Sequence, residues 1–263
     1  HPAQSVCVAM ELVRDVLLMI FGRWRNAQVW LILCITVFSW CGASLPAGYS
    51  GPPAWEKTKV HGGEIEIRSF GQATDPLVVL IHGMMDNDFI HNEWNAVAFG
   101  LAVEGFHVLV PNFHSGPGSM QPGSMSGESM RTFLSTILLP MNHMVSEHKK
   151  VIVMGKSWGA RMALETGLSQ DVAAIAAVVP AISAEAAREL LPSISSKLAF
   201  CFAKDDPVVK FESADTFIRA ALDDRRKALG DRSDVVWEVA SHGGHRVLPH
   251  FTKPLVNFAL SAR

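Results

Sequence analysis

The stretch "VIVMGKSWGA", residues 151–160, allows two interpretations that imply different enzymes. Its G-K-S triplet resembles the end of a phosphate-binding loop, whereas residues 155–159 have the G-x-S-x-G pattern of a nucleophile turn. A phosphate-binding loop needs another glycine five positions before Gly155. Lys150 stands there, and a β-branched run follows it that does not readily adopt the backbone angles of such a loop. The sequence therefore favours the nucleophile turn.

In a nucleophile turn, a buried strand bends sharply into a helix with the serine at the apex. The residues two before and two after the serine must be small, because strand and helix approach closely there. The apolar run Val151 to Met154 predicts the strand, and the segment that begins at Trp158 predicts the helix. Ser157 is therefore the predicted nucleophile.

The composition limits the classes of protein that the chain can belong to. Its 263 residues fit one α/β domain with an appendage. A formal net charge of −2 and the lack of a Lys/Arg cluster give no support for nucleic-acid binding. The sequence contains neither a C-x-x-C nor an H-E-x-x-H spacing, so we expect no metal and no cofactor. Cys201, in an apolar strand-like run, is expected to be a small core residue.

The first part of the chain has the features of a targeting segment. No charged residue occurs from Asn26 to Trp55, and the apolar run at about 27–45 is preceded by arginines and followed by prolines and glycines. This pattern predicts a signal peptide or a signal-anchor helix, and the choice between the two stays open. We expect an N-terminal region at 1–54 and a catalytic domain at 55–263. The protein would be secreted, or attached to a membrane with that domain outside the cytosol.

From about residue 55, strand-like and helix-like segments alternate along the chain. This alternation predicts an α/β fold, with a mostly parallel central sheet and helices on both faces. The segment 63–70 is expected to be an edge strand. The charge-free segment 114–127 is either a surface loop or the rim of a substrate pocket. Further strands are expected at 77–83, 106–113, 150–157, 172–181, 197–206 and 234–245, and helices at 93–104, 128–148, 158–169, 184–191, 211–229 and 251–260.

A serine nucleophile needs a base, and the base needs an orienting acid. In a fold with this kind of turn the chain order is serine, acid, histidine. Asp205 and Asp206 both end the predicted strand at 197–206, and His245 follows the last predicted strand. Adjacent residues of a strand point in opposite directions, so only one of the two aspartates can face the histidine.

Four motifs in this order resemble those of the α/β-hydrolase superfamily: "LIHGMMD" (80–86), "GKSWG" (155–159), "AKDDPVV" (203–209) and "GGHRVLP" (243–249). The resemblance covers residues 60–263. It implies an α/β-hydrolase fold with a catalytic triad of Ser157, Asp206 and His245, and Asp205 as the alternative acid. It also implies an oxyanion hole formed by the backbone N–H groups of Met84 and Trp158, and a structural role for His82.

The same resemblance implies a serine hydrolase that cleaves carboxylic ester or thioester bonds through a covalent acyl-enzyme. Because only a short segment separates the strands expected at 172–181 and 197–206, we expect little or no cap, and a small or extended ester-like substrate. A peptidase with the same triad, or a catalytically silent module that binds a ligand or a protein, remains an alternative. Asn112 departs from the family pattern, in which an aspartate usually occupies that position.

Overall fold

The computed structural model describes residues 52–60, 63–84, 92–113, 151–168, 172–230 and 235–263. The predicted signal or anchor segment at 27–45, the loop at 114–127 and the helix at 128–148 lie outside these residues and stay predictions, as does the domain boundary at 54/55. Within the described ranges, no helix combines the length and apolar composition that crossing a membrane requires.

The described strands form one sheet in the order β1-β2-β4-β3-β5-β6-β7-β8. Strands β1 and β2, and strands β2 and β4, pair antiparallel, whereas all other neighbours pair parallel. The strands are β1 (Glu56–Val60), β2 (Gly63–Phe70), β3 (Leu77–Ile81), β4 (His107–Asn112), β5 (Val151–Lys156), β6 (Val172–Val178), β7 (Lys197–Ala203) and β8 (Val235–Ala240).

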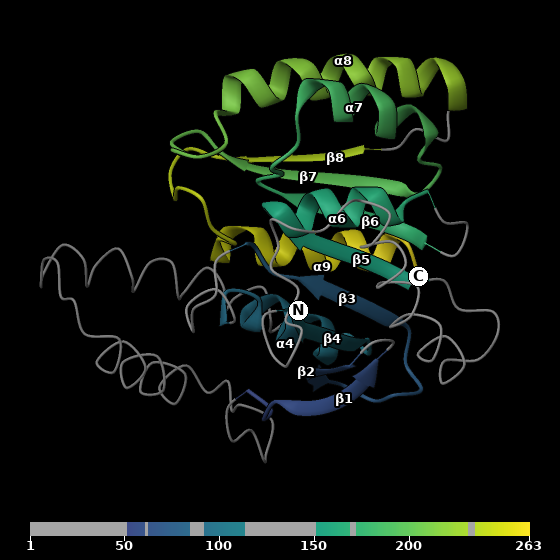
Figure 1. Cartoon of the computed structure of the whole chain (residues 1–263), viewed down its shortest axis with the longest axis vertical. Coiled ribbons are helices and arrows are strands. Elements are labelled where there is room, and N and C mark those ends of the chain that lie inside the picture. The colour runs from purple at the N-terminus through teal and green to yellow at the C-terminus, as the bar shows by residue number, and fades with distance from the viewer. Residues whose placement is uncertain (1–51, 61–62, 85–91, 114–150, 169–171, 231–234) are drawn as a thin grey trace, which may run out of the picture. The chain divides into compact units, whose positions relative to one another are not determined.

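Helices cover both faces of this sheet (Figure 1). The described helices are α4 (Asn95–Val103), α6 (Trp158–Thr166), α7 (Ala184–Leu190), the short 3-10 helix η2 (Leu191–Ser193), α8 (Phe211–Leu229) and α9 (Pro249–Ser261). Apolar residues of α6, α7 and α8 form one core with one face of the sheet, and those of α4 and α9 form a second core with the other face. The predicted α/β architecture is confirmed.

The central strands are apolar throughout because they are covered on both faces. Every residue of β3, β4 and β5 is buried, as expected for parallel strands between two helical layers. The carboxyl ends of the parallel strands point towards one edge of the sheet, which lies at the left of Figure 1. The connection from β8 to α9 runs along that edge, and the motifs identified in the sequence follow β3, β5, β7 and β8.

The prediction that 63–70 is an edge strand was wrong. Strand β1, which the sequence did not predict, pairs along β2 and forms the edge instead. Its sequence "EKTKV" lacks the apolar alternation that identifies strands. Charged residues on an edge strand discourage pairing with further chains. The charged composition that kept β1 from being predicted therefore suits a strand at the edge of the sheet.

Two other expectations concern segments near the carboxyl ends of the parallel strands. The connection between β6 and β7 contains only α7 and η2, so no cap is inserted there. Asn112, at the end of β4, lies opposite Glu66 of β2 and donates a 3.2 Å hydrogen bond from Nδ2 to its carboxylate. An aspartate at position 112 would put two carboxylates together, which explains the departure from the family pattern.

Candidate active site

Ser157 occupies a strained turn between β5 and α6. Its backbone angles, φ 56° and ψ −115°, lie outside the regions that residues with a Cβ atom normally adopt. Two backbone hydrogen bonds fix this conformation: Ser157 N–H donates to Val178 at 2.9 Å, and Ala181 N–H donates to the Ser157 carbonyl at 3.1 Å. Strain of this kind persists only where the surrounding structure determines it, and it is common at active sites.

The two glycines of the motif are required by close packing. A Cβ atom at Gly155 would collide with the backbone of Gly159, and a Cβ atom at Gly159 would collide with the carbonyl oxygens of Ile81 and His82. Each obstacle is backbone, which cannot move as a flexible side chain can. The predicted need for small residues on both sides of Ser157 is confirmed, and the end of β3 is thereby packed against the start of α6.

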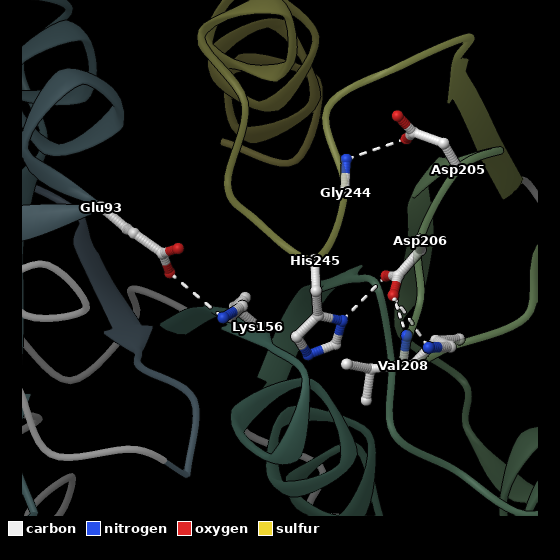
Figure 2. Close-up of polar contacts among 8 residues, drawn as sticks. Glu93, Lys156, Asp205, Asp206, Val208, Gly244 and His245 are labelled. Carbon is white, nitrogen blue, oxygen red and sulfur yellow. Dashed lines mark hydrogen bonds and ion pairs between the residues drawn. The ribbon is translucent and has the colours of Figure 1, made fainter. Parts of the chain in front are cut away.

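The structure brings His245 and Asp206 together (Figure 2). His245 Nδ1 lies 2.8 Å from Asp206 Oδ2, and the two side chains are 17% and 1% exposed. The other oxygen of Asp206 accepts hydrogen bonds from the backbone N–H groups of Val208 and Val209, at 2.8 and 2.9 Å. A carboxylate only accepts, so Nδ1 of His245 carries the proton and Nε2 is left as the basic nitrogen.

Asp205, the alternative acid in the sequence, points elsewhere. Its carboxylate accepts hydrogen bonds from the backbone N–H groups of Gly243 and Gly244, at 3.1 and 2.8 Å. Both glycines have positive φ, 141° and 67°, which residues with side chains rarely adopt. The bonds from Gly244 and Gly243 lower the pKa of Asp205. Asp205 therefore holds the loop that carries His245, while Asp206 contacts the imidazole itself.

The segments that contain Met84 and Trp158 lie close together. Met84 lies three residues after the end of β3, and β3 pairs with β5 so that Ile81 lies opposite Gly155. Trp158 is the first residue of α6, in which Ala160 and Arg161 donate the first hydrogen bonds to the Ser157 carbonyl. The N–H groups of a helix's first turn have no acceptor within the helix, so that of Trp158 is available to a ligand. Its indole is buried and packs edge-on against Phe113.

His82 is a structural residue, as expected. It is buried, its Nε2 accepts a 3.0 Å hydrogen bond from the Phe113 N–H, and its Nδ1 donates to the Gly83 carbonyl. Both ring nitrogens are therefore used to fix the backbone between β3 and β4.

The surroundings of His245 favour its neutral form. Burial lowers the pKa of His245, the hydrogen bond and charge of Asp206 raise it, and the positive charge of Lys156 lowers it, with a net decrease. Figure 2 draws the His245 ring beside Lys156, the residue that directly precedes Ser157. A histidine that stays neutral near neutral pH can accept a proton.

The sequence did not predict the buried ion pair of Lys156 and Glu93, whose nitrogen and oxygen lie 3.4 Å apart. The only signal was a charged residue at the end of an otherwise apolar strand. Burial raises the pKa of the Cys201 thiol, and its side chain lies in the core as expected. Among the described residues, no group of three or more His, Cys, Asp or Glu side chains could hold a metal ion.

The sheet order, the strained turn and the histidine after the last strand define an α/β-hydrolase. Residues 69–229 match the family model described as the dienelactone hydrolase family, and the chain belongs to that family. The protein is therefore a hydrolase. A comparison with curated protein sequences gave no match.

Solved structures with the same fold include three hydrolases or hydrolase homologues of low sequence identity. An esterase from Pyrococcus furiosus is 16% identical, with a TM-score of 0.63 over 80% of this chain and 93% of that one. A thioesterase domain from the curacin biosynthetic pathway is 14% identical, with a TM-score of 0.59 over 80% and 100%. An α/β serine hydrolase homologue from Coxiella burnetii is 18% identical, with a TM-score of 0.60 over 80% and 99%. At these identities the similarity shows the fold alone.

Proposed function

We propose that this hydrolase is a serine esterase that cleaves small carboxylic esters or thioesters through Ser157, His245 and Asp206. The observation that carries the proposal is the 2.8 Å contact between His245 Nδ1 and the buried Asp206, in a chain whose Ser157 has a strained backbone. A buried acid fixes the tautomer of the base, and a strained turn exposes the nucleophile.

In this mechanism, Ser157 Oγ attacks the acyl carbon while its proton moves to His245 Nε2. The carbonyl oxygen becomes an oxyanion and accepts hydrogen bonds from the backbone N–H groups of Met84 and Trp158. Each such donor typically contributes about 3 kcal/mol of transition-state stabilisation. The bond to the alcohol or thiol then breaks, and the leaving group takes the proton from Nε2. Water attacks the acyl-enzyme with the same nitrogen as base, which releases the acid and restores Ser157.

The short β6–β7 connection supports the preference for small or extended substrates. A cap inserted at that place would cover the site, but the connection holds only α7 and η2. The likeness in fold to an esterase and to a thioesterase domain recommends testing both oxygen esters and thioesters. Amide substrates belong in the same panel, because a peptidase would use the same three residues.

The test is labelling of the full chain with a fluorophosphonate probe, followed by turnover of an activated ester. Ser157→Ala and His245→Ala should both reduce labelling and turnover to background. His242→Ala is the matched control: its side chain is 88% exposed and lies 3.7 Å from Asp205, so labelling should persist. Undiminished turnover by folded Ser157→Ala would exclude Ser157 as nucleophile. A folded wild type that binds small molecules but is never labelled would favour the silent binding module.

A further inference from the structure

The ion pair between Lys156 and Glu93 lies where charged side chains are costly. The two side chains are 5% and 3% exposed. Their 3.4 Å contact is longer than a normal hydrogen bond, and neither carboxylate oxygen of Glu93 has a hydrogen-bond partner among the described residues. Burying two charges in this geometry contributes little to stability and is often matched by apolar residues. The pair therefore calls for an explanation other than stability.

Glu93 stands on a firmly held part of the chain. Its neighbour Trp94 is fully buried and donates a 3.2 Å hydrogen bond from Nε1 to the carbonyl of Ile81, the last residue of β3. On the other side, Asn92 Oδ1 accepts a 3.0 Å hydrogen bond from Arg68 of β2. Because both neighbours are anchored to the sheet, Glu93 can hold the Lys156 ammonium in one place.

The stem of Lys156 covers the segment that leads to Met84. A Cβ atom at Gly83 would lie 3.2 Å from Lys156 Cδ and 3.3 Å from Nζ, so the lysine lies directly over the Gly83 backbone. Gly83 immediately precedes Met84, one of the two proposed oxyanion donors. The lysine stem therefore packs against this backbone, together with the hydrogen bond from His82 to the Gly83 carbonyl.

The ammonium end of Lys156 also faces the base. Figure 2 draws the His245 ring between Lys156, at the end of β5, and Asp206, in the turn after β7. The positive charge of Lys156 acts against protonation of His245. The other charged or titratable groups around this loop are Glu93 before α4, Arg246 in the loop itself, Asp205 in the turn after β7, and His242 after β8.

We propose that Lys156, held by Glu93, is a positioning residue of the hydrolase: its stem supports the backbone of Gly83 and Met84, and its ammonium lies on the other side of the His245 ring from Asp206. This inference rests on the proposed function. Lys156 contacts no reacting atom. It acts through the packing of its stem on the Gly83 backbone and through the effect of its own charge on the His245 imidazole.

The decisive variants neutralise the pair without leaving one charge buried alone. Lys156→Met/Glu93→Gln keeps the carbon stem over Gly83 and removes both charges, whereas Lys156→Ala/Glu93→Gln removes the stem as well. The control is Lys227→Met/Asp224→Asn, which neutralises an ion pair of 2.8 Å on the surface of α8, with side chains 77% and 58% exposed. The kcat and kcat/KM of the full chain would be measured against pH with an activated ester.

We expect the acidic limb of kcat/KM to lie at higher pH in both Lys156 variants than in the wild type, because His245 loses the nearby positive charge. On the alkaline plateau, the alanine variant should lose about tenfold in kcat relative to the methionine variant at similar KM, because a displaced oxyanion donor affects mainly the transition state. The surface control should match the wild type in both measurements.

Two results would overturn the inference: an acidic limb that does not move in folded Lys156 variants, or equal kcat in the alanine and methionine variants. If the double variants do not fold, Lys156→Gln carries the same test of the acidic limb, because burial raises the pKa of Glu93 and its protonated form leaves no buried charge. The proposed function is tested by a different measurement, the fluorophosphonate labelling of Ser157 in the wild type. If the wild type is not labelled, the proposed function fails whatever the Lys156 variants show.

Discussion

The two halves of the candidate active site are held in different ways. The half with Ser157 is fixed by backbone: Ser157 N–H donates to Val178 of β6, Ala181 N–H donates to the Ser157 carbonyl, and the motif glycines pack against other main-chain atoms. The half with His245 is fixed by side chains, since adjacent carboxylates hold the imidazole and the glycine loop before it. Gly243 and Gly244 are only half-buried, in contrast to Gly155 and Gly159.

The difference indicates where each half can fail. Backbone packing tolerates no added atom, so substitutions in the Ser157 half should reduce the stability of the protein. Side chains that form hydrogen bonds can be substituted without unfolding the protein, so substitutions in the His245 half should reduce activity in a folded protein. Matched substitutions can test this distinction.

The largest expected effect is that of Asp206→Asn. The amide oxygen would keep the hydrogen bonds from Val208 and Val209, which turns the NH₂ group towards His245. Nδ1 would then have to accept, and the proton would move to Nε2, where the base is needed. We expect kcat to fall by about 10⁴-fold, the typical loss when the acid of a Ser-His-Asp triad is replaced by an amide, with little loss of stability. Ester turnover and the melting temperature measure the two effects.

A large loss of stability, or a small loss of activity, in Asp206→Asn would contradict this view of the His245 half. If Asp206→Asn melted far below the wild type, the carboxylate would be holding the fold as well as the base. If the variant kept most of its activity, Asp206 would not fix the tautomer, and the acid role would have to be sought elsewhere.

In the Ser157 half, Gly159→Ala should mainly reduce stability. Its Cβ would collide with the carbonyl oxygens of Ile81, the last residue of β3, and of His82, which follows it. We expect the free energy of unfolding to fall by about 3 kcal/mol, measured by denaturant titration. Gly100→Ala is the control, because its Cβ would meet only side-chain atoms of Val256 and Thr252, at 3.1 and 3.6 Å. Equal losses in the two variants would mean that the turn is no more tightly packed than an ordinary helix contact.

The sequence predicted what depends on local pattern. Continuous apolar runs identified the central strands, and the G-x-S-x-G spacing identified the turn, because sterics leave few residue types possible there. It missed β1, whose charged composition suits an edge but hides a strand. Only the family resemblance selected Asp206 as the acid, with Asp205 as the alternative, and the sequence did not predict the pairing of Glu93 with Lys156. Both depend on where a side chain points, or on which distant segment comes close, and neither is visible in local sequence.

The smallest expected effect is that of Asp205→Asn, the same substitution one residue earlier. The amide would keep one of the hydrogen bonds from Gly243 and Gly244 and lose the other. Because the loop stays attached and Asp206 still contacts His245, we expect kcat/KM to fall by about fivefold or less.

This modest loss should also be independent of pH across the neutral range. The hydrogen bonds from the glycine N–H groups lower the pKa of Asp205, so its carboxylate holds the loop fully above the ordinary pKa of aspartate. That hold is lost only as the pH falls through the lowered value. The ratio of wild-type to Asp205→Asn activity should therefore stay constant from about pH 6 to 9. A loss as large as that of Asp206→Asn would mean that the loop, rather than the imidazole contact, limits catalysis in this half of the site.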